Sequence, residues 1–163
     1  MPAKKQEVYS VKKKTATSKK NLKKKSEKKD FTVVGIGASA GGLETLEAFF
    51  RNMPPEPGIA FVIIQHRSPK HKSIMAELLA RHTTMTVRQI EDATPLEPNC
   101  VYLNPPDKNV AVFNRVLHLM EPVKTGAINM PVDYFFRVLS EDQKERAIAV
   151  ILSGTASDGT GMK

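Results

Sequence analysis

The stretch FTVVGIGASAGG at residues 31–42 is the strongest indication of the fold, because an apolar run passes directly into a loop of glycine and other small residues. Residues 31–36 have the composition of a buried strand, and Ser39 follows within the loop. A small-residue loop between a strand and a helix can hold a serine on a tight turn, with its hydroxyl exposed beyond the strand. We therefore interpret Ser39 as a candidate nucleophile, close to backbone N–H groups at the start of the next helix.

Two other interpretations of this loop remain open. Gly35, Gly37 and Ala40 also fit a relaxed dinucleotide fingerprint, in which the glycines would admit a pyrophosphate. The loop is equally compatible with a structural turn that does no chemistry. A dinucleotide site favours an acidic residue at the end of the next strand, where it binds a ribose. Here that strand closes on Gln65 and His66, which weakens the nucleotide interpretation.

The apolar pattern predicts alternating strands and helices along the chain. Continuous apolar runs indicate strands that are covered on both faces, whereas apolar residues at helical spacing indicate amphipathic helices. We expect helices over residues 43–50 and 70–82, the second with Ile74, Met75, Leu78 and Leu79 on one face, and another from about residue 129. The expected strands are residues 59–64, 101–103 and 147–152, together with a hairpin of residues 110–113 and 116–120 that turns at Asn114 and Arg115.

This alternation predicts an α/β fold with three layers, in which helices cover both faces of a mostly parallel, doubly wound sheet. Functional sites of such sheets lie beyond the carboxyl ends of the strands. Ser39, His66 and the loop 153–159, which contains Asp158, each follow an apolar strand. Serine, histidine and aspartate supply the nucleophile, base and orienting carboxylate of acyl transfer. The competing residues are His71, His82 and His118, and Asp92, Asp107 and Asp133, which also suit surface or capping positions.

The positive charge of the chain belongs to its first 30 residues. The net charge is +8, and twelve of the 25 Lys and Arg residues, but three of the 17 acidic residues, lie in residues 1–30. Such a segment buries too little apolar surface to order itself, so we expect a disordered, lysine-rich tail. Both a solubilising arm and an electrostatic tether to an anionic surface fit this composition. Because the remaining residues are nearly neutral, no specific nucleic-acid partner is expected.

Composition also bears on the compartment. No run approaches the roughly 20 apolar residues of a transmembrane helix, so no such segment is expected. Cys100 is the single cysteine, which excludes an internal disulfide or a thiolate metal site, and we expect it in the core. These features favour a reducing, cytoplasmic setting.

Three ordered motifs resemble the catalytic domain of CheB, the chemotaxis protein-glutamate methylesterase. They are GIGASAGG at residues 35–42, FVIIQH at 61–66 and VILSGTASDG at 150–159, supported by EDATPLEPNCVY at 91–102 and PVDYFF at 131–136. The resemblance covers about residues 31–163. It implies hydrolysis of γ-glutamyl methyl esters on the cytoplasmic helices of chemoreceptors, and possibly glutamine deamidation, without a metal or another cofactor.

The resemblance assigns a role to five positions. It implies that Ser39 is the nucleophile, His66 the base and Asp158 the orienting carboxylate, while the backbone N–H groups of Ala40 and Thr155 bind the oxyanion. At two of these positions the chain differs from many members of the family. They have threonine and methionine where this chain has Ala40 and Thr155.

The arrangement looks most like the amino-terminal part of fusions with a CheR-type methyltransferase, without a preceding receiver domain. Since family members continue past the aspartate loop, we expect a domain that is incomplete at its carboxyl end. A non-catalytic receptor-interaction fragment therefore remains the alternative.

Overall fold

The computed structural model describes residues 30–39, 41–66, 74–122 and 129–153. By its contacts the chain divides into two units, Met1–Asp30 and Phe31–Lys163. The expected tail coincides with the first unit, but residues 1–29 lie outside the described residues, so the expectation of disorder stays a prediction.

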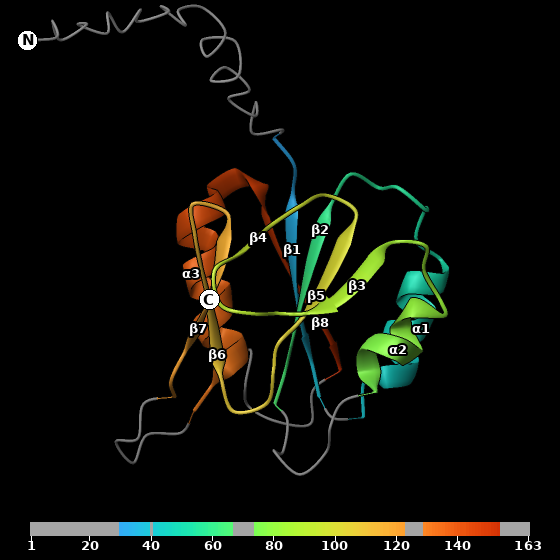
Figure 1. Ribbon diagram of the computed structural model, residues 1–163, viewed down its shortest axis with the longest axis horizontal. Coiled ribbons are helices and arrows are strands. Elements are labelled where there is room, and N and C mark those ends of the chain that lie inside the picture. The colour runs from blue at the N-terminus through green and yellow to red at the C-terminus, as the bar shows by residue number, and fades with distance from the viewer. Residues whose placement is uncertain (1–29, 40, 67–73, 123–128, 154–163) are drawn as a thin grey trace, which may run out of the picture. The chain divides into compact units, whose positions relative to one another are not determined.

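The second unit contains a parallel sheet of five strands in the order β3-β5-β2-β1-β8. Figure 1 shows this sheet with α1 and α2 on one face and α3 on the other. The sheet strands are β1 (Val33–Ala38), β2 (Ala60–Gln65), β3 (Thr86–Gln89), β5 (Cys100–Leu103) and β8 (Ala147–Ser153), and the helices are α1 (Leu43–Arg51), α2 (Met75–Ala80), α3 (Pro131–Gln143) and the 3₁₀ helix η1 (Lys144–Arg146). The three-layer α/β fold predicted from the alternation is confirmed.

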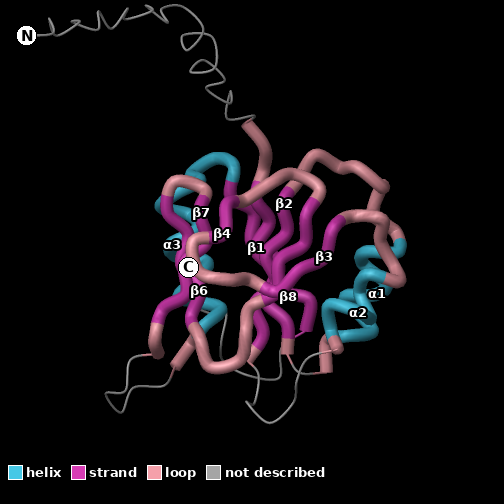
Figure 2. Tube along the Cα trace, viewed as in Figure 1, coloured by secondary structure: helices cyan, strands magenta, loops and turns pink. Residues whose placement is uncertain are grey.

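A second, antiparallel sheet lies beside α3, in the order β4-β7-β6 (Figure 2). It consists of β4 (Thr94–Pro95), β6 (Asn109–Phe113) and β7 (Val116–Met120). The predicted hairpin is confirmed, and its turn residues Asn114 and Arg115 have φ values of 49° and 64°. Positive φ at both central residues is the geometry of a tight hairpin turn whose twist matches that of its strands.

Two hydrophobic clusters pack the two faces of the parallel sheet. Alternate residues of β2 enter opposite clusters: Val62 and Ile64 pack with α3, whereas Phe61 and Ile63 pack with α1 and α2. Such alternation follows from the two-residue period of a strand. The continuous apolar run of β2 therefore reflects helices on both of its faces, as expected.

Several sequence predictions were wrong in detail. Of the predicted helix 70–82, the described part is helical only over Met75–Ala80, and Ile74, expected on the buried face, is 60% exposed. Residues 147–152 form a strand as predicted, but Ile148 and Ile151 are 48% and 50% exposed because β8 lies at the edge of the described sheet. The strands β3 and β4 were not predicted, since their short, half-exposed sequences lack a clear apolar pattern.

Candidate functional site

The sheet register brings Ser39 and His66 to adjacent positions. Ala38 and Gln65, the last residues of β1 and β2, are paired across neighbouring parallel strands. Ser39 follows Ala38 directly, and His66 follows Gln65 directly. Because neighbouring strands lie about 4.8 Å apart, both residues leave the carboxyl end of the sheet close to each other. The predicted convergence of these two residues is therefore supported by the register of the strands that carry them.

The strand that precedes the loop with Asp158 pairs with the other side of β1. In the register between β1 and β8, Ala38 pairs with Ser153, after a shift that adds one residue to β8 beyond Ile151. Such bulges redirect the chain at the end of a strand and are common beside active sites. The loop that contains Thr155 and Asp158 follows, and both residues, like Ala40, lie outside the described residues. Their roles stay predictions.

The turn after β1 connects Ser39 to the start of α1. The backbone N–H of Gly42 donates to the carbonyl oxygen of Ser39 at 2.9 Å, and the carbonyl of Gly42 accepts from Leu46 at 2.9 Å. Ser39 is half-buried, one tight turn before the amino end of α1. The positive end of a helix dipole favours negative charge at this place. The turn thus places a serine where a developing oxyanion would be stabilised.

The glycines of the motif have a different role from the one expected. Gly35 and Gly37 belong to β1, and neither has a positive φ; among the described glycines, only Gly58 does. A Cβ on Gly37 would lie 2.6 Å from Cγ1 of Val132, and one on Gly35 would lie 3.0 Å from Cδ2 of Leu139. The glycines are thus required for close packing of α3 on β1.

The carboxyl end of β2 contains buried polar groups that sequence reasoning missed. Gln65 is 2% exposed, and its side-chain Nε2 has no hydrogen-bond partner within the described part of the chain. Asn104, which follows β5 directly, is also buried and forms hydrogen bonds with the backbone of Gln65. The sequence shows an asparagine between an apolar strand and two prolines at 105 and 106, which marks a special position. It does not show that Gln65 is the partner of this asparagine.

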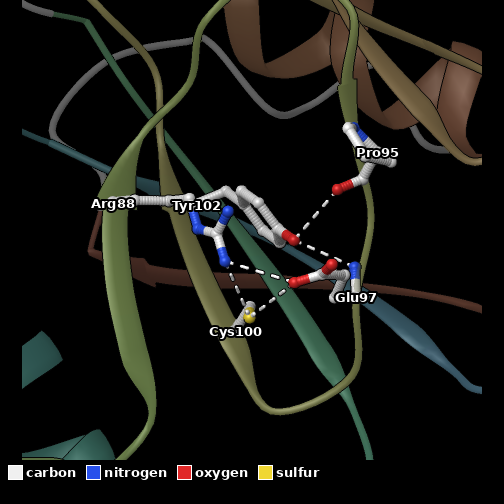
Figure 3. Close-up of polar contacts among 5 residues, drawn as sticks. All are labelled: Arg88, Pro95, Glu97, Cys100 and Tyr102. Carbon is white, nitrogen blue, oxygen red and sulfur yellow. Dashed lines mark hydrogen bonds and ion pairs between the residues drawn. The ribbon is translucent and has the colours of Figure 1, made fainter.

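A second polar cluster consists of Arg88, Pro95, Glu97, Cys100 and Tyr102 (Figure 3). Burial raises the pKa of Tyr102 well above its usual value, and its hydroxyl donates to the carbonyl of Pro95 at 3.2 Å. The same hydroxyl accepts from the backbone N–H of Glu97 at 2.9 Å. Arg88 Nη2 lies 3.2 Å from Glu97 Oε2 and 3.6 Å from Cys100 Sγ. These contacts connect β3, β5 and the segment around β4, which is a structural role.

A cavity of about 670 Å³ adjoins this cluster and is lined by Thr86, Arg88, Pro98 and Cys100, among others. Cys100 is buried, as predicted, and pairs in register with Ala60 at the start of β2. Ala60 and Gln65 are five residue steps apart along an extended strand, which is roughly 16 Å. The cavity is therefore distinct from the carboxyl end of the sheet, where Ser39 and His66 lie.

Three of the competing candidates, His82, His118 and Asp92, have partners elsewhere in the fold. His82 Nε2 lies 3.6 Å from Glu47, and His118 Nδ1 lies 3.7 Å from Asp92. The Asp92 pKa is lowered chiefly because its carboxylate accepts a hydrogen bond from the backbone of Leu119. The other candidates are Asp133 in the first turn of α3, Asp107 with a positive φ, and His71, which lies outside the described residues.

Comparison with known proteins identifies the class. The family model described as CheB methylesterase matches residues 34–163. The crystal structure of the Thermotoga maritima CheB methylesterase catalytic domain superposes with a TM-score of 0.72 at 30% identity, covering 81% of this chain and 72% of that chain. The chain belongs to the CheB methylesterase family.

Curated relatives agree with this assignment. A protein-glutamate methylesterase/protein-glutamine glutaminase of Thermotoga maritima is 30% identical over 78% of this chain, and one of Desulfotalea psychrophila is 27% identical over 92%. An uncharacterised 104.1 kDa protein of Rhodobacter capsulatus is 43% identical over 53% of this chain and 9% of its own length. The chain spans 38% and 42% of the lengths of the two methylesterases.

Other kinds of site find little support in the described ranges. No group of three or more His, Cys, Asp or Glu residues there is arranged to hold a metal ion. Within the same ranges, no helix has the length and apolar character needed to cross a bilayer.

Proposed function

We propose that this domain hydrolyses γ-glutamyl methyl esters on the cytoplasmic helices of chemoreceptors, with Ser39 as nucleophile and His66 as general base. The observation that carries the proposal is the pairing of Ala38 with Gln65, since Ser39 and His66 follow these residues directly at the carboxyl end of the sheet. Membership of the CheB methylesterase family supports the chemistry. Sites of open parallel sheets lie at this edge.

The reaction follows from the residue types. His66 takes the proton of the Ser39 hydroxyl while the oxygen attacks the ester carbonyl carbon, and it returns the proton to the departing methanol. Water, activated by His66, then hydrolyses the acyl-enzyme and leaves a glutamate side chain. A glutamine side chain would release ammonia in the first step instead.

Asp158 orients the His66 ring and stabilises its charged form, and the backbone N–H groups of Ala40 and Thr155 bind the oxyanion. The partner in the complete signalling system is a methylated chemoreceptor, which places the reaction in the cytoplasm. The similarity to a 104.1 kDa protein supports the further proposal that the full-length protein joins this domain to other domains, such as a CheR-type methyltransferase.

Ser39→Ala tests the proposal directly. In the full-length protein, the variant should release methanol from a methyl-esterified receptor fragment about a thousandfold more slowly, or not at all, because the attacking oxygen is lost. Its circular dichroism spectrum should match that of the wild type. Activity within a fewfold of the wild type would exclude Ser39 as nucleophile. Receptor binding without hydrolysis by the wild type would favour a non-catalytic interaction domain.

A further inference from the structure

The peptide unit that precedes His66 is held by one buried side chain. Asn104 Nδ2 donates to the carbonyl oxygen of Gln65 at 2.9 Å, and Asn104 Oδ1 accepts from the backbone N–H of Gln65 at 2.9 Å. Both residues are buried, Asn104 at 3% and Gln65 at 2% exposure. The amide of Asn104 therefore satisfies both backbone groups of the last residue of β2.

The sequence after Asn104 explains why a side chain is needed here. The backbone N–H of Asn104 donates to Ile63 at 3.2 Å, which is the last backbone bond between β5 and β2. The next residues along the chain, Pro105 and Pro106, have no N–H group. The carbonyl of Gln65 thus has no backbone donor from the continuing chain, and a buried unpaired carbonyl is costly. The Asn104 side chain replaces the missing donor.

The orientation of this amide is determined by its two partners. Only Nδ2 can donate to a carbonyl, and only Oδ1 can accept from an N–H group, so a flipped amide would lose both bonds. His66 is exposed, so packing alone does not hold it. Its backbone is joined to the Gln65 carbonyl through the same planar peptide unit. Fixing that plane fixes the direction in which His66 leaves the sheet.

We propose that Asn104 is a positioning residue for His66, acting through the Gln65–His66 peptide unit. The proposal rests on the proposed function, in which His66 is the general base. A catalytic group that is displaced by about 1 Å loses roughly a hundredfold in rate, so a bond that orients the base affects turnover more than binding. Asn104 itself contacts neither the ester nor Ser39 in this role.

The same pair of strands offers a matched control at its other end. Asn99 Oδ1 accepts from the backbone N–H of Gly58 at 2.7 Å, just before β5 and β2 begin. Asn99 has a φ of 60°, which glycine adopts without strain. Asn99→Gly therefore removes a comparable bond between a side chain and the backbone, far from His66. Asn104→Ala removes both bonds to Gln65, and Asn104→Asp retains the acceptor but removes the donor.

The experiment measures kcat, KM and the NMR signals of the His66 ring in the full-length protein. In both Asn104 variants kcat should fall about 10- to 100-fold while KM stays within about twofold. The His66 ring signals should shift or broaden in these variants and stay unchanged in Asn99→Gly, whose kcat should stay within about twofold. Circular dichroism confirms that each variant is folded.

Three results would overturn the positioning role: an unchanged kcat in Asn104→Ala, a reduced kcat with unchanged His66 signals, or loss of the fold in both Asn104 variants. The NMR comparison needs no activity and can be repeated in a Ser39→Ala background. If the wild-type protein hydrolyses no ester, the proposed function fails, while the response of the His66 signals still decides whether Asn104 orients that residue.

Discussion

Two regions of the parallel sheet use polar side chains differently. Within β5, the hydroxyl of Tyr102 has both a donor and an acceptor, and it connects the segment around β4 to the sheet (Figure 3). At the carboxyl end, His66 is exposed, and Gln65 Nε2 is buried with no hydrogen-bond partner among the described residues. The comparison indicates that the Tyr102 cluster serves stability, whereas the polar side chains at the carboxyl end of β2 are only partly paired within the described part of the chain.

The largest expected difference between the two regions is in catalysis. His66→Gln should lower kcat about a thousandfold or more, since the base that activates Ser39 is lost. Cys100→Ala, in the Tyr102 cluster, should leave kcat within about twofold, because the thiol is a buried structural group. Both rates are measured by methanol release from the same receptor ester. Equal losses in the two variants would remove the functional distinction between the regions.

The second prediction concerns the close packing of α3 beneath the site. Gly37→Ala should lower the free energy of unfolding by about 1–3 kcal/mol, since the new methyl group would meet Val132 at 2.6 Å. Gly41→Ala is the matched control, because a Cβ there has no neighbouring atom within 4 Å, and its cost should be within about 0.5 kcal/mol. Denaturant unfolding followed by circular dichroism measures both. Similar costs would show that these glycines are not distinguished by packing.

The smallest expected effect is in the polar cluster around Tyr102. Tyr102→Phe should lower the free energy of unfolding by about 1–2 kcal/mol, because the backbone groups of Pro95 and Glu97 lose their partner. The value of kcat should not change. Thermal unfolding and ester turnover, measured on one preparation, check the two statements together. A loss of turnover at temperatures where the variant is fully folded would connect this cluster to the site.

The order of the main elements and the adjacency of Ser39 and His66 were predictable from the sequence. Continuous apolar runs such as residues 59–64 indicate buried strands, and parallel strand ends meet at one edge. β3 was not predictable, because its four residues, two exposed and two half-buried, show no apolar alternation and form a strand by pairing with β5. The contribution of Asp158 remains a prediction that the sequence alone supports.

By itself, the sequence determined the α/β class, the family motifs and the candidate residues, because these depend on local periodicity and on residue types at strand ends. Only the tertiary structure decided the role of Gly37, which depends on Val132 in α3, and that of Asn104, which binds Gln65 from 39 residues away. Both roles arise from contacts between distant segments. Local sequence patterns do not identify such partners, because residues far apart in the sequence become neighbours only when the sheet forms.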